Sequence, residues 1–236
     1  MKLLVYSLAI FGSILFSATA QSVRKDSGES GLPKIYLDYV KGGPFDRECG
    51  EALSKPVKRE DMDELNNRLA EFQAIWDKDG NDYLQIVIKE IGRPFPFREV
   101  HATLTACEFS SMSSPFLIYT KSFLSSAPKP HPVSVFPIVI FHELMHIYLR
   151  NLHDSSWHSK FSSESARTLN QAYIMALEKF VTERSGKTTV LQWLDIRYRT
   201  RLTPDHKRAW ELINNEGYNV FIEEIKKAAS KKRSFK

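Results

Sequence analysis

Residues 135–149 of this 236-residue chain read VFPIVIFHELMHIYL, and this stretch says most about the fold and the chemistry. Apolar residues on both sides of three polar ones predict a helix that lies in the core. His142 and His146 are four residues apart, so they share one helix face and both imidazoles can reach a single metal ion. Glu143 directly follows the first histidine, which suits it to act on the metal's water rather than on the metal.

The predicted motif helix covers about residues 134–152, and its start carries helix signals. Ser134 is suited to cap the N-terminus, and Pro137 falls in the first turn, where a missing N–H costs nothing. A buried helix avoids polar side chains unless they have partners, and a metal ion would supply one. The alternative is a surface turn that carries two solvated histidines.

The N-terminus has the layout of a secretory signal peptide. Lys2 is followed by an apolar stretch over residues 3–16 and then by Ser17-Ala18-Thr19-Ala20, which fits an A-x-A cleavage site. We therefore expect residues 1–20 to be a signal peptide, with an uncleaved anchor as the alternative. We expect no later segment to be apolar enough to span a membrane. The expected product is secreted or periplasmic, with no stable membrane insertion after signal cleavage.

After cleavage about 216 residues remain, enough for one domain with a sizeable core. Residues 21–32, rich in Ser, Gly and charges, are expected to be a flexible leader. Residues 33–236 are expected to form a single domain with a basic C-terminal tail. Cys49 and Cys107 could form one disulfide in an oxidising compartment, although two unpaired thiols fit the sequence nearly as well.

The net charge of +5 is largely a property of this tail. No acidic residue occurs from residue 226 onward, and the rest of the chain has a net charge of −1. The six basic residues are Lys226, Lys227, Lys231, Lys232, Arg233 and Lys236. We interpret them as a solvated C-terminus whose cations favour the end of the last helix, and we expect no nucleic-acid partner. Contact with nucleic acid or anionic lipid is the alternative.

Periodicity along the chain predicts a mostly helical α+β domain, with a small antiparallel or mixed sheet before the motif helix. Residues 77–82 resemble a calcium loop only superficially, because the glycine is misplaced and Ile88 stands where Glu is needed, so we expect a turn there. The expected strands are 35–40 (or a turn of helix), 98–108 and 116–120, and the expected helices are 60–78, 83–91, 134–152, 163–185, 188–200, 203–213 and 218–230.

The five residues His142-Glu143-Leu144-Met145-His146 resemble the motif of the zincin metallopeptidases. The resemblance implies a zincin-like, metallopeptidase-like domain over residues 33–236, with Zn²⁺ as cofactor and three protein ligands. The metzincin branch needs a glycine and a third histidine where this chain has Leu149 and Leu152, so that branch is rejected. The gluzincin branch takes a glutamate from a later helix as the third ligand, and this chain has such a helix.

Two glutamates compete for the role of third zinc ligand. Glu178 lies mid-helix among apolar residues, where a carboxylate needs a partner, so we favour it. Glu164 is closer to the spacing of thermolysin-like enzymes, but the dipole at a helix start explains it equally well. Each of the two lies seven residues from Gln171, so all three share one face of the helix. His158 is a more distant candidate, and a solvated Glu178 is the alternative to any metal role.

The resemblance also implies a mechanism and a substrate. A zinc-bound water would be activated by Glu143 as general base, so the expected function is that of a secreted zinc-dependent metallopeptidase acting on a peptide or protein substrate. His206, Tyr173 and Tyr218 are candidates for stabilising the oxyanion, and none is preferred. In zincins an edge strand binds extended peptide, and the resemblance implies that residues 116–120 are that strand, with an interior strand as the alternative.

Two further hypotheses stay open at this point. One is an exported zinc-binding protein without proteolytic activity that acts by binding a partner. The other is a helical binding module in which the motif is accidental.

Overall fold

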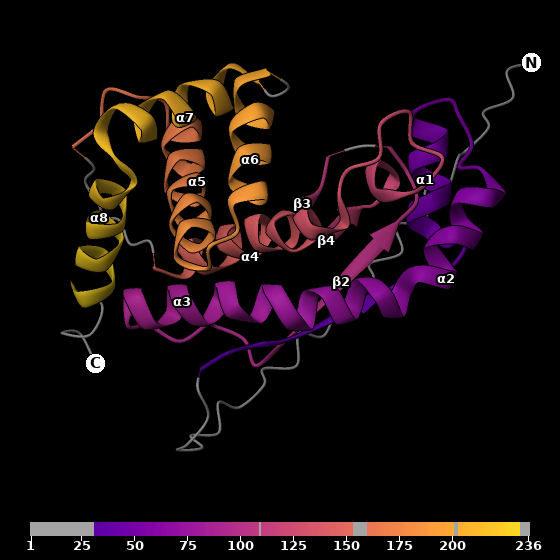
Figure 1. Ribbon diagram of the computed structural model, residues 1–236, viewed down its shortest axis with the longest axis horizontal. Coiled ribbons are helices and arrows are strands. Elements are labelled where there is room, and N and C mark those ends of the chain that lie inside the picture. Colours follow the sequence, from indigo (N-terminus) through magenta and orange to yellow (C-terminus); the bar gives the residue numbers. More distant parts are fainter. Residues whose placement is uncertain (1–30, 109, 153–159, 201–202, 232–236) are drawn as a thin grey trace, which may run out of the picture.

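The computed structural model describes residues 31–108, 110–152, 160–200 and 203–231 (Figure 1). The expected signal peptide, most of the expected leader, His158 and the end of the basic tail lie outside these ranges. The strands are β1 (Lys34–Asp38), β2 (Glu99–Thr105), β3 (Met112–Ser113) and β4 (Phe116–Tyr119). The helices are α1 (Pro44–Ala52), α2 (Arg59–Ile75), α3 (Asn81–Ile91), α4 (Phe136–Leu152), α5 (Ala166–Arg184), α6 (Thr188–Thr200), α7 (Pro204–Glu216) and α8 (Tyr218–Lys231).

The four strands form one mixed sheet in the order β1-β2-β4-β3. Strand β2 runs parallel to both β1 and β4, while β3 runs antiparallel to β4. The α+β class, mostly helical with a small sheet before the motif helix, is therefore confirmed. The prediction that residues 116–120 form an edge strand is wrong, because β4 lies between β2 and β3. The short strand β3 takes the edge position beside α4 instead.

One face of the sheet is buried, which follows from the alternation of its sequence. In β1 the side chains of Ile35 and Leu37 are buried, and in β2 those of Val100, Ala102 and Leu104 are buried. Helix α2 packs on β1, and α4 packs on β3 and β4. The motif helix therefore lies against the end of the sheet that carries its edge strand.

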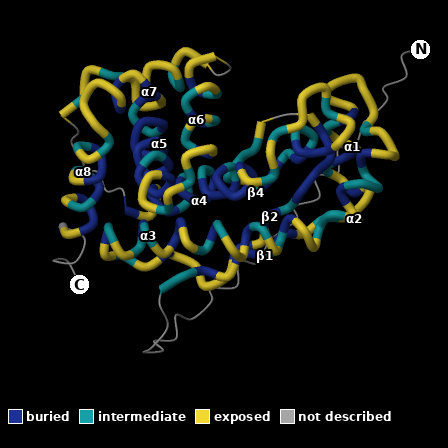
Figure 2. The backbone as a smooth tube through the Cα atoms, viewed as in Figure 1, coloured by how far each residue is buried: buried dark blue, intermediate teal, exposed yellow. Residues whose placement is uncertain are grey.

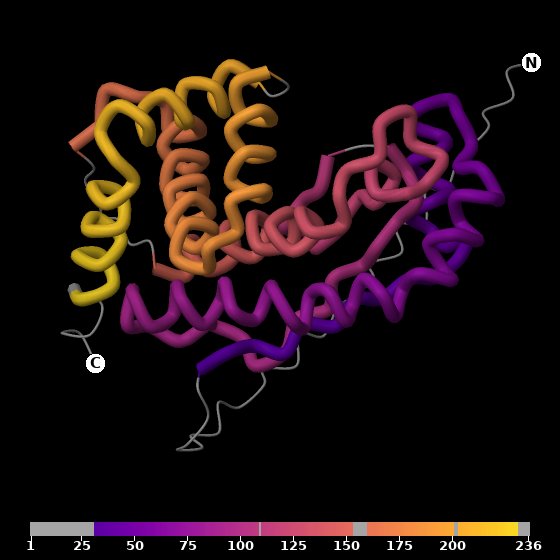
Figure 3. Tube along the Cα trace, in the orientation of Figure 1, coloured from indigo at the N-terminus to yellow at the C-terminus, as the bar shows by residue number. Residues whose placement is uncertain are grey.

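Helices α2 and α3 are joined without a break, contrary to the turn expected at residues 77–82 (Figure 3). A π-helical turn, Trp76–Gly80, connects them. The ring of Trp76 lies against Gly80 so closely that a Cβ at that position would overlap it. Glycine at this position therefore leaves room for the buried Trp76 ring. Because glycine usually weakens a helix, the residue type alone suggests a break here instead. The expected helix end at Gly92 is confirmed, since Gly92 adopts a left-handed conformation.

Helix α4 is the centre of the core (Figure 2). It is preceded by a 3₁₀ turn, Val133–Val135, so Ser134 lies inside that turn rather than capping α4, while Pro137 is in the first turn as expected. By length and composition Val133–Leu152 is apolar enough to cross a membrane, contrary to our expectation that no later segment is. Most of this segment is buried against the sheet and against α5 and α8, which accounts for its apolar composition.

Helix α5 is the second core helix and has capping residues at both ends. Ser165 caps its start by accepting a hydrogen bond from the backbone N–H of Thr168 at 3.0 Å, and the left-handed Gly186 follows its end. Helices α4, α6, α7 and α8 all pack against α5. This arrangement puts the middle of α5 opposite the motif residues of α4 (Figure 1).

A disulfide joins Cys49 of α1 to Cys107, just after β2, with 6.3 Å between the Cα atoms. This confirms the bonded form of the two that the sequence allowed. The buried carboxylate of Asp46 supports the same junction, because it accepts hydrogen bonds from Thr105 Oγ1 at 2.6 Å and from the backbone N–H of Ala106 at 3.0 Å. Helix α1 is thus tied to the sheet both covalently and by a buried polar network.

The two chain ends differ from expectation where the structure describes them. The backbone oxygen of Gly31 accepts a hydrogen bond from Phe95 at 3.1 Å and Leu32 packs on the core, so the expected flexible leader is already part of the domain at these residues. Lys226 pairs with Glu90 and Glu223 at 2.8 and 3.0 Å. The first cation of the basic tail therefore contacts the domain instead of being free in solvent.

Candidate active site

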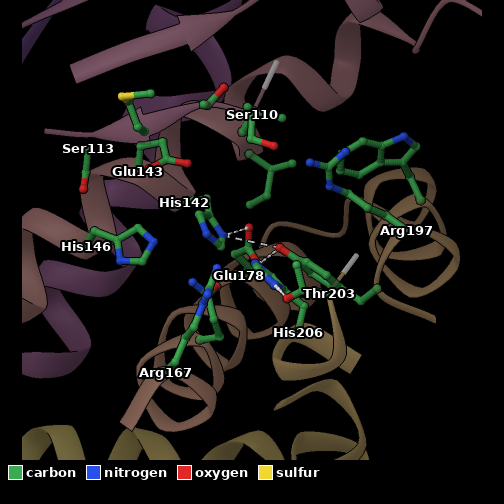
Figure 4. Close-up of a pocket in the computed structure, with 17 residues that line it drawn as sticks. Ser110, Ser113, His142, Glu143, His146, Arg167, Glu178, Arg197, Thr203 and His206 are labelled. Carbon is green, nitrogen blue, oxygen red and sulfur yellow. Dashed lines mark hydrogen bonds and ion pairs between the residues drawn. The ribbon is translucent and has the colours of Figure 1, made fainter. Parts of the chain in front are cut away.

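A cavity of about 360 Å³ opens between α4, α5, α6, the start of α7 and the segment that leads into β3 (Figure 4). All three polar residues of the motif line it. Their neighbours are drawn from four other parts of the chain. The lining residues are Ser110, Ser111, Met112, Ser113, Ile138, Val139, His142, Glu143, His146, Arg167, Gln171, Glu178, Trp193, Arg197, Tyr198, Thr203 and His206.

The two motif histidines lie side by side on α4, as their spacing predicts. Their ring centroids are 5.1 Å apart and the ring planes are at 74°. Glu143 lies on the same wall and is 7% exposed. The helix therefore presents two imidazoles and one carboxylate to the cavity within a single turn.

Glu178 is the glutamate that reaches the motif, in agreement with the preference from sequence. Its side chain is 2% exposed, and Oε1 accepts a hydrogen bond from Nδ1 of His142 at 3.1 Å. The hydroxyl of Tyr198 donates to Oε2 at 2.6 Å and lies 3.4 Å from the same Nδ1. Both carboxylate oxygens are thus engaged, so Glu178 is not a solvated helix charge.

Glu164 does not reach the cavity. It lies just before α5, and its carboxylate is held by the guanidinium of Arg208 at 2.6 Å. Of the three oxyanion candidates, only His206 lines the cavity. Tyr173 donates its hydroxyl to Glu224 on α8, and Tyr218 packs beside Phe180.

Both motif histidines are held through Nδ1. Nδ1 of His146 lies 3.2 Å from the side-chain amide of Asn170 on α5, and Nδ1 of His142 is bonded to Glu178. Among the described residues, neither Nε2 atom has a hydrogen-bond partner. At His142 this is the pattern of metal-binding histidines, in which an outer acceptor fixes Nδ1–H and Nε2 is left for the metal. At His146 the partner is the amide nitrogen of Asn170, a donor, so a metal on Nε2 requires this amide to turn its oxygen toward Nδ1.

Burial sets the ionisation of the cavity wall. Burial, reinforced by His142, Arg150 and His206, lowers the pKa of His146 to about 3, and burial with nearby His142 and two arginines lowers that of His206 to about 4. Burial alone would lower the pKa of His142, but the Glu178 carboxylate outweighs it and raises that pKa. Burial raises the pKa of the Glu143 carboxyl above its usual value.

Several residues in the cavity wall or behind it carry no signal that the sequence could have shown. Tyr198, Asn170 and Arg197 belong to ordinary amphipathic helices and have no motif spacing. Gln171 was visible only as a position on the same helix face as Glu178. In the structure its Oε1 is buried and has no hydrogen-bond partner among the described residues, an unsatisfied acceptor in the cavity wall.

The side chains present fit a zinc ion by their chemistry. Two half-buried imidazoles whose Nε2 atoms have no partner among the described residues, and a buried carboxylate beside one of them, are a set that zinc prefers. Within the described ranges, however, no three His, Cys, Asp or Glu side chains already converge at metal-binding geometry. Glu178 touches the Nδ1 side of His142, which is the position of an outer partner, so its carboxylate would have to leave this contact to bind a metal held on Nε2.

Comparisons of the whole chain with protein-family models, with curated proteins and with solved structures give no match.

Proposed function

We propose that this chain is a zinc-dependent metallopeptidase that hydrolyses peptide bonds in the cavity beside α4. One observation carries the proposal: a buried glutamate from α5 contacts the first histidine of a His-Glu-x-x-His motif whose polar residues all face one cavity. Structural packing alone gives no reason to bury two imidazoles and two carboxylates together, since each costs free energy to desolvate.

His142 and His146 would hold the zinc through Nε2, together with Glu178 as third ligand. When bound, zinc supplies a Lewis acid that polarises a substrate carbonyl and acidifies a water molecule. Asn170 lies against Nδ1 of His146, and Tyr198 donates to Oε2 of Glu178. Because these groups are fixed on α5 and α6, they would set the orientation of the His146 ring and of the Glu178 carboxylate without rearrangement of α4.

Glu143 is the proposed general base. Its carboxylate lies in the cavity wall next to the two histidines but forms no ion pair with a cation among the described residues. It would take the proton from the attacking water and pass it to the leaving amine. The largely buried position keeps that carboxylate poorly hydrated, which strengthens its pull on a proton.

Strand β3 supplies a place for extended peptide. Met112 and Ser113 line the cavity, and β3 is the outer strand of the sheet on that side. A peptide that adds to this edge by backbone hydrogen bonds would be extended, and its backbone would pass Glu143. The substrate class is therefore a peptide or an unfolded protein segment.

The disulfide supports an exported location, because such bonds persist in oxidising compartments and are rare in the cytosol. We therefore propose that the peptidase acts outside the cell or in a periplasm.

The test is a metal and activity measurement on the full chain and on Glu143→Gln. We expect about one zinc per chain in both proteins, and hydrolysis of an unstructured protein by the wild type only. The variant should lose about 10²–10⁴-fold or more in rate, because the general base is gone. Glu60→Gln, an exposed position on α2, is the matched control. Equal rates in Glu143→Gln and wild type would refute the mechanism, and zinc without any hydrolysis would favour a zinc-binding protein that acts through a partner.

A further inference from the structure

Two arginines enter the same cavity from different helices (Figure 4). Arg167 comes from the first turn of α5 and Arg197 from the last turn of α6. The guanidinium of Arg197 lies over the ring of Trp193, 5.0 Å from its centroid. His131 packs edge-on against the same indole, with 5.3 Å between the ring centroids. The cation–π contact with Trp193 therefore restricts the position of the Arg197 side chain.

Arg197 has no carboxylate within ion-pair distance in the part of the chain that the structure describes. Arg167 reaches one, Asp205, but only at 3.6 Å and with both side chains partly exposed. By contrast, the next arginine on α6, Arg199, is paired with Asp195 at 2.7 Å on the outer face. A half-buried guanidinium that lacks an acidic partner and faces a cavity is free to bind an anionic ligand.

The charge balance of the cavity points the same way. Its formal charges are those of two arginines and of two glutamates, Glu143 and Glu178. A divalent cation would leave the cavity with two positive charges in excess. The buried acceptor of Gln171 lies in the same wall, so polar groups of a ligand also have a partner there.

We propose that Arg197, assisted by Arg167, forms a carboxylate subsite, so that the substrates are peptides with a carboxylate close to the scissile bond. The proposal rests on the peptidase function above. The carboxylate comes either from an acidic side chain or from a free C-terminus, since both match the paired donors of a guanidinium. Packing of Arg197 on Trp193 for stability alone is the competing explanation.

The experiment uses four peptides of one sequence, with Glu or Gln beside the cleaved bond and with a free or amidated C-terminus. Their binding to full-length Glu143→Gln is measured by calorimetry, and their kcat/KM is measured with the wild type. We expect one carboxylate to strengthen binding and to raise kcat/KM by about tenfold or more, as a charge-assisted hydrogen bond allows. The Glu/Gln pair reports an acidic side chain, and the acid/amide pair reports a C-terminus.

The variants identify the residue. In the Glu143→Gln background, Arg197→Gln should abolish the preference for the carboxylate, Arg197→Lys should keep part of it, and Arg199→Gln should keep all of it. Equal binding of acidic and neutral peptides, or an unchanged preference in Arg197→Gln, would overturn the proposal. Binding that shows the preference without hydrolysis by the wild type would refute the peptidase and leave the subsite standing. Hydrolysis by the wild type without any preference for the carboxylate would refute the subsite and leave the peptidase function standing.

Discussion

The two walls of the cavity are built in opposite ways. The α4 wall takes His142, Glu143 and His146 from a single helical turn in the core. The facing wall assembles Glu178, Arg197 and other side chains from α5, α6 and the start of α7. In the proposed function the first wall supplies the general base and two zinc ligands, while the second supplies Glu178, fixes side-chain orientation and sets the charge around the site. Changes in the α4 wall should therefore abolish function, and changes in the facing wall outside Glu178 should grade it.

The largest effect should separate two histidines that are equally neutral. His146 on α4 and His206 on α7 both line the cavity, and burial keeps the pKa of each low. His146→Ala removes a proposed zinc ligand and should weaken zinc binding on the order of a thousandfold. This corresponds to about 4 kcal/mol of the roughly 10–16 kcal/mol with which a structural zinc site binds its metal. His206→Ala should keep the zinc and lose about 10²–10³-fold in rate, as expected for an oxyanion donor.

Zinc affinity by competition with a chelator and hydrolysis by initial rates measure the two effects separately. Circular dichroism shows whether each variant folds. Loss of zinc in His206→Ala comparable to that in His146→Ala would place His206 among the ligands and make the two walls alike.

The contrast between the walls also explains how far the sequence could be interpreted. The α4 wall could be predicted because helical periodicity converts a spacing of four into a shared face, and the apolar flanks predict burial. The same local logic predicted α5 and its favoured glutamate, since a carboxylate among apolar residues needs a partner. The structure places Glu178 against Nδ1 of His142, and its role as a zinc ligand stays a prediction.

What the sequence could not show depends on contacts between distant segments. Tyr198 and Asn170 contact the motif only because α6 and α5 pack against α4, and no local pattern reports that. The resemblance to zincins gave the edge position to residues 116–120, and β3 escapes prediction because a strand of two residues is too short to show a period. The sequence predicts a turn at residues 77–82 because the close contact of the Trp76 ring with Gly80, which requires a glycine there, cannot be recognised from sequence.

A second comparison tests the facing wall through its two glutamates. Glu178→Gln keeps the size of the side chain but removes the charge beside His142, so zinc affinity should fall by about 10–100-fold, or beyond detection. Glu164→Gln breaks only an exposed ion pair with Arg208, and zinc affinity should stay within about twofold.

Isothermal titration with zinc gives both values on the same preparation. A residual affinity within 10–100-fold of the wild type would identify Glu178 as an outer partner of His142, and no measurable binding would identify it as a direct ligand. Equal affinities in Glu178→Gln and Glu164→Gln would remove Glu178 from the site altogether.

The smallest effect should come from one hydroxyl group in the facing wall. Tyr198→Phe leaves Oε2 of Glu178 without its 2.6 Å donor, so we expect the metal-free chain to lose about 1.5–3 kcal/mol of unfolding free energy. Zinc affinity should fall by at most about tenfold, because the donor acts on the metal only through Glu178. Tyr148→Phe is the matched control, since its hydroxyl donates at 2.8 Å to the neutral backbone oxygen of Arg93. That change should cost about 1 kcal/mol and leave zinc affinity unaltered. Urea unfolding of both variants without zinc measures the loss of unfolding free energy, and the same experiment with zinc measures how much the metal stabilises each variant. If both tyrosines changed zinc affinity equally, the effect would be one of general core stability, and the hydrogen bond from α6 to Glu178 would not orient the site.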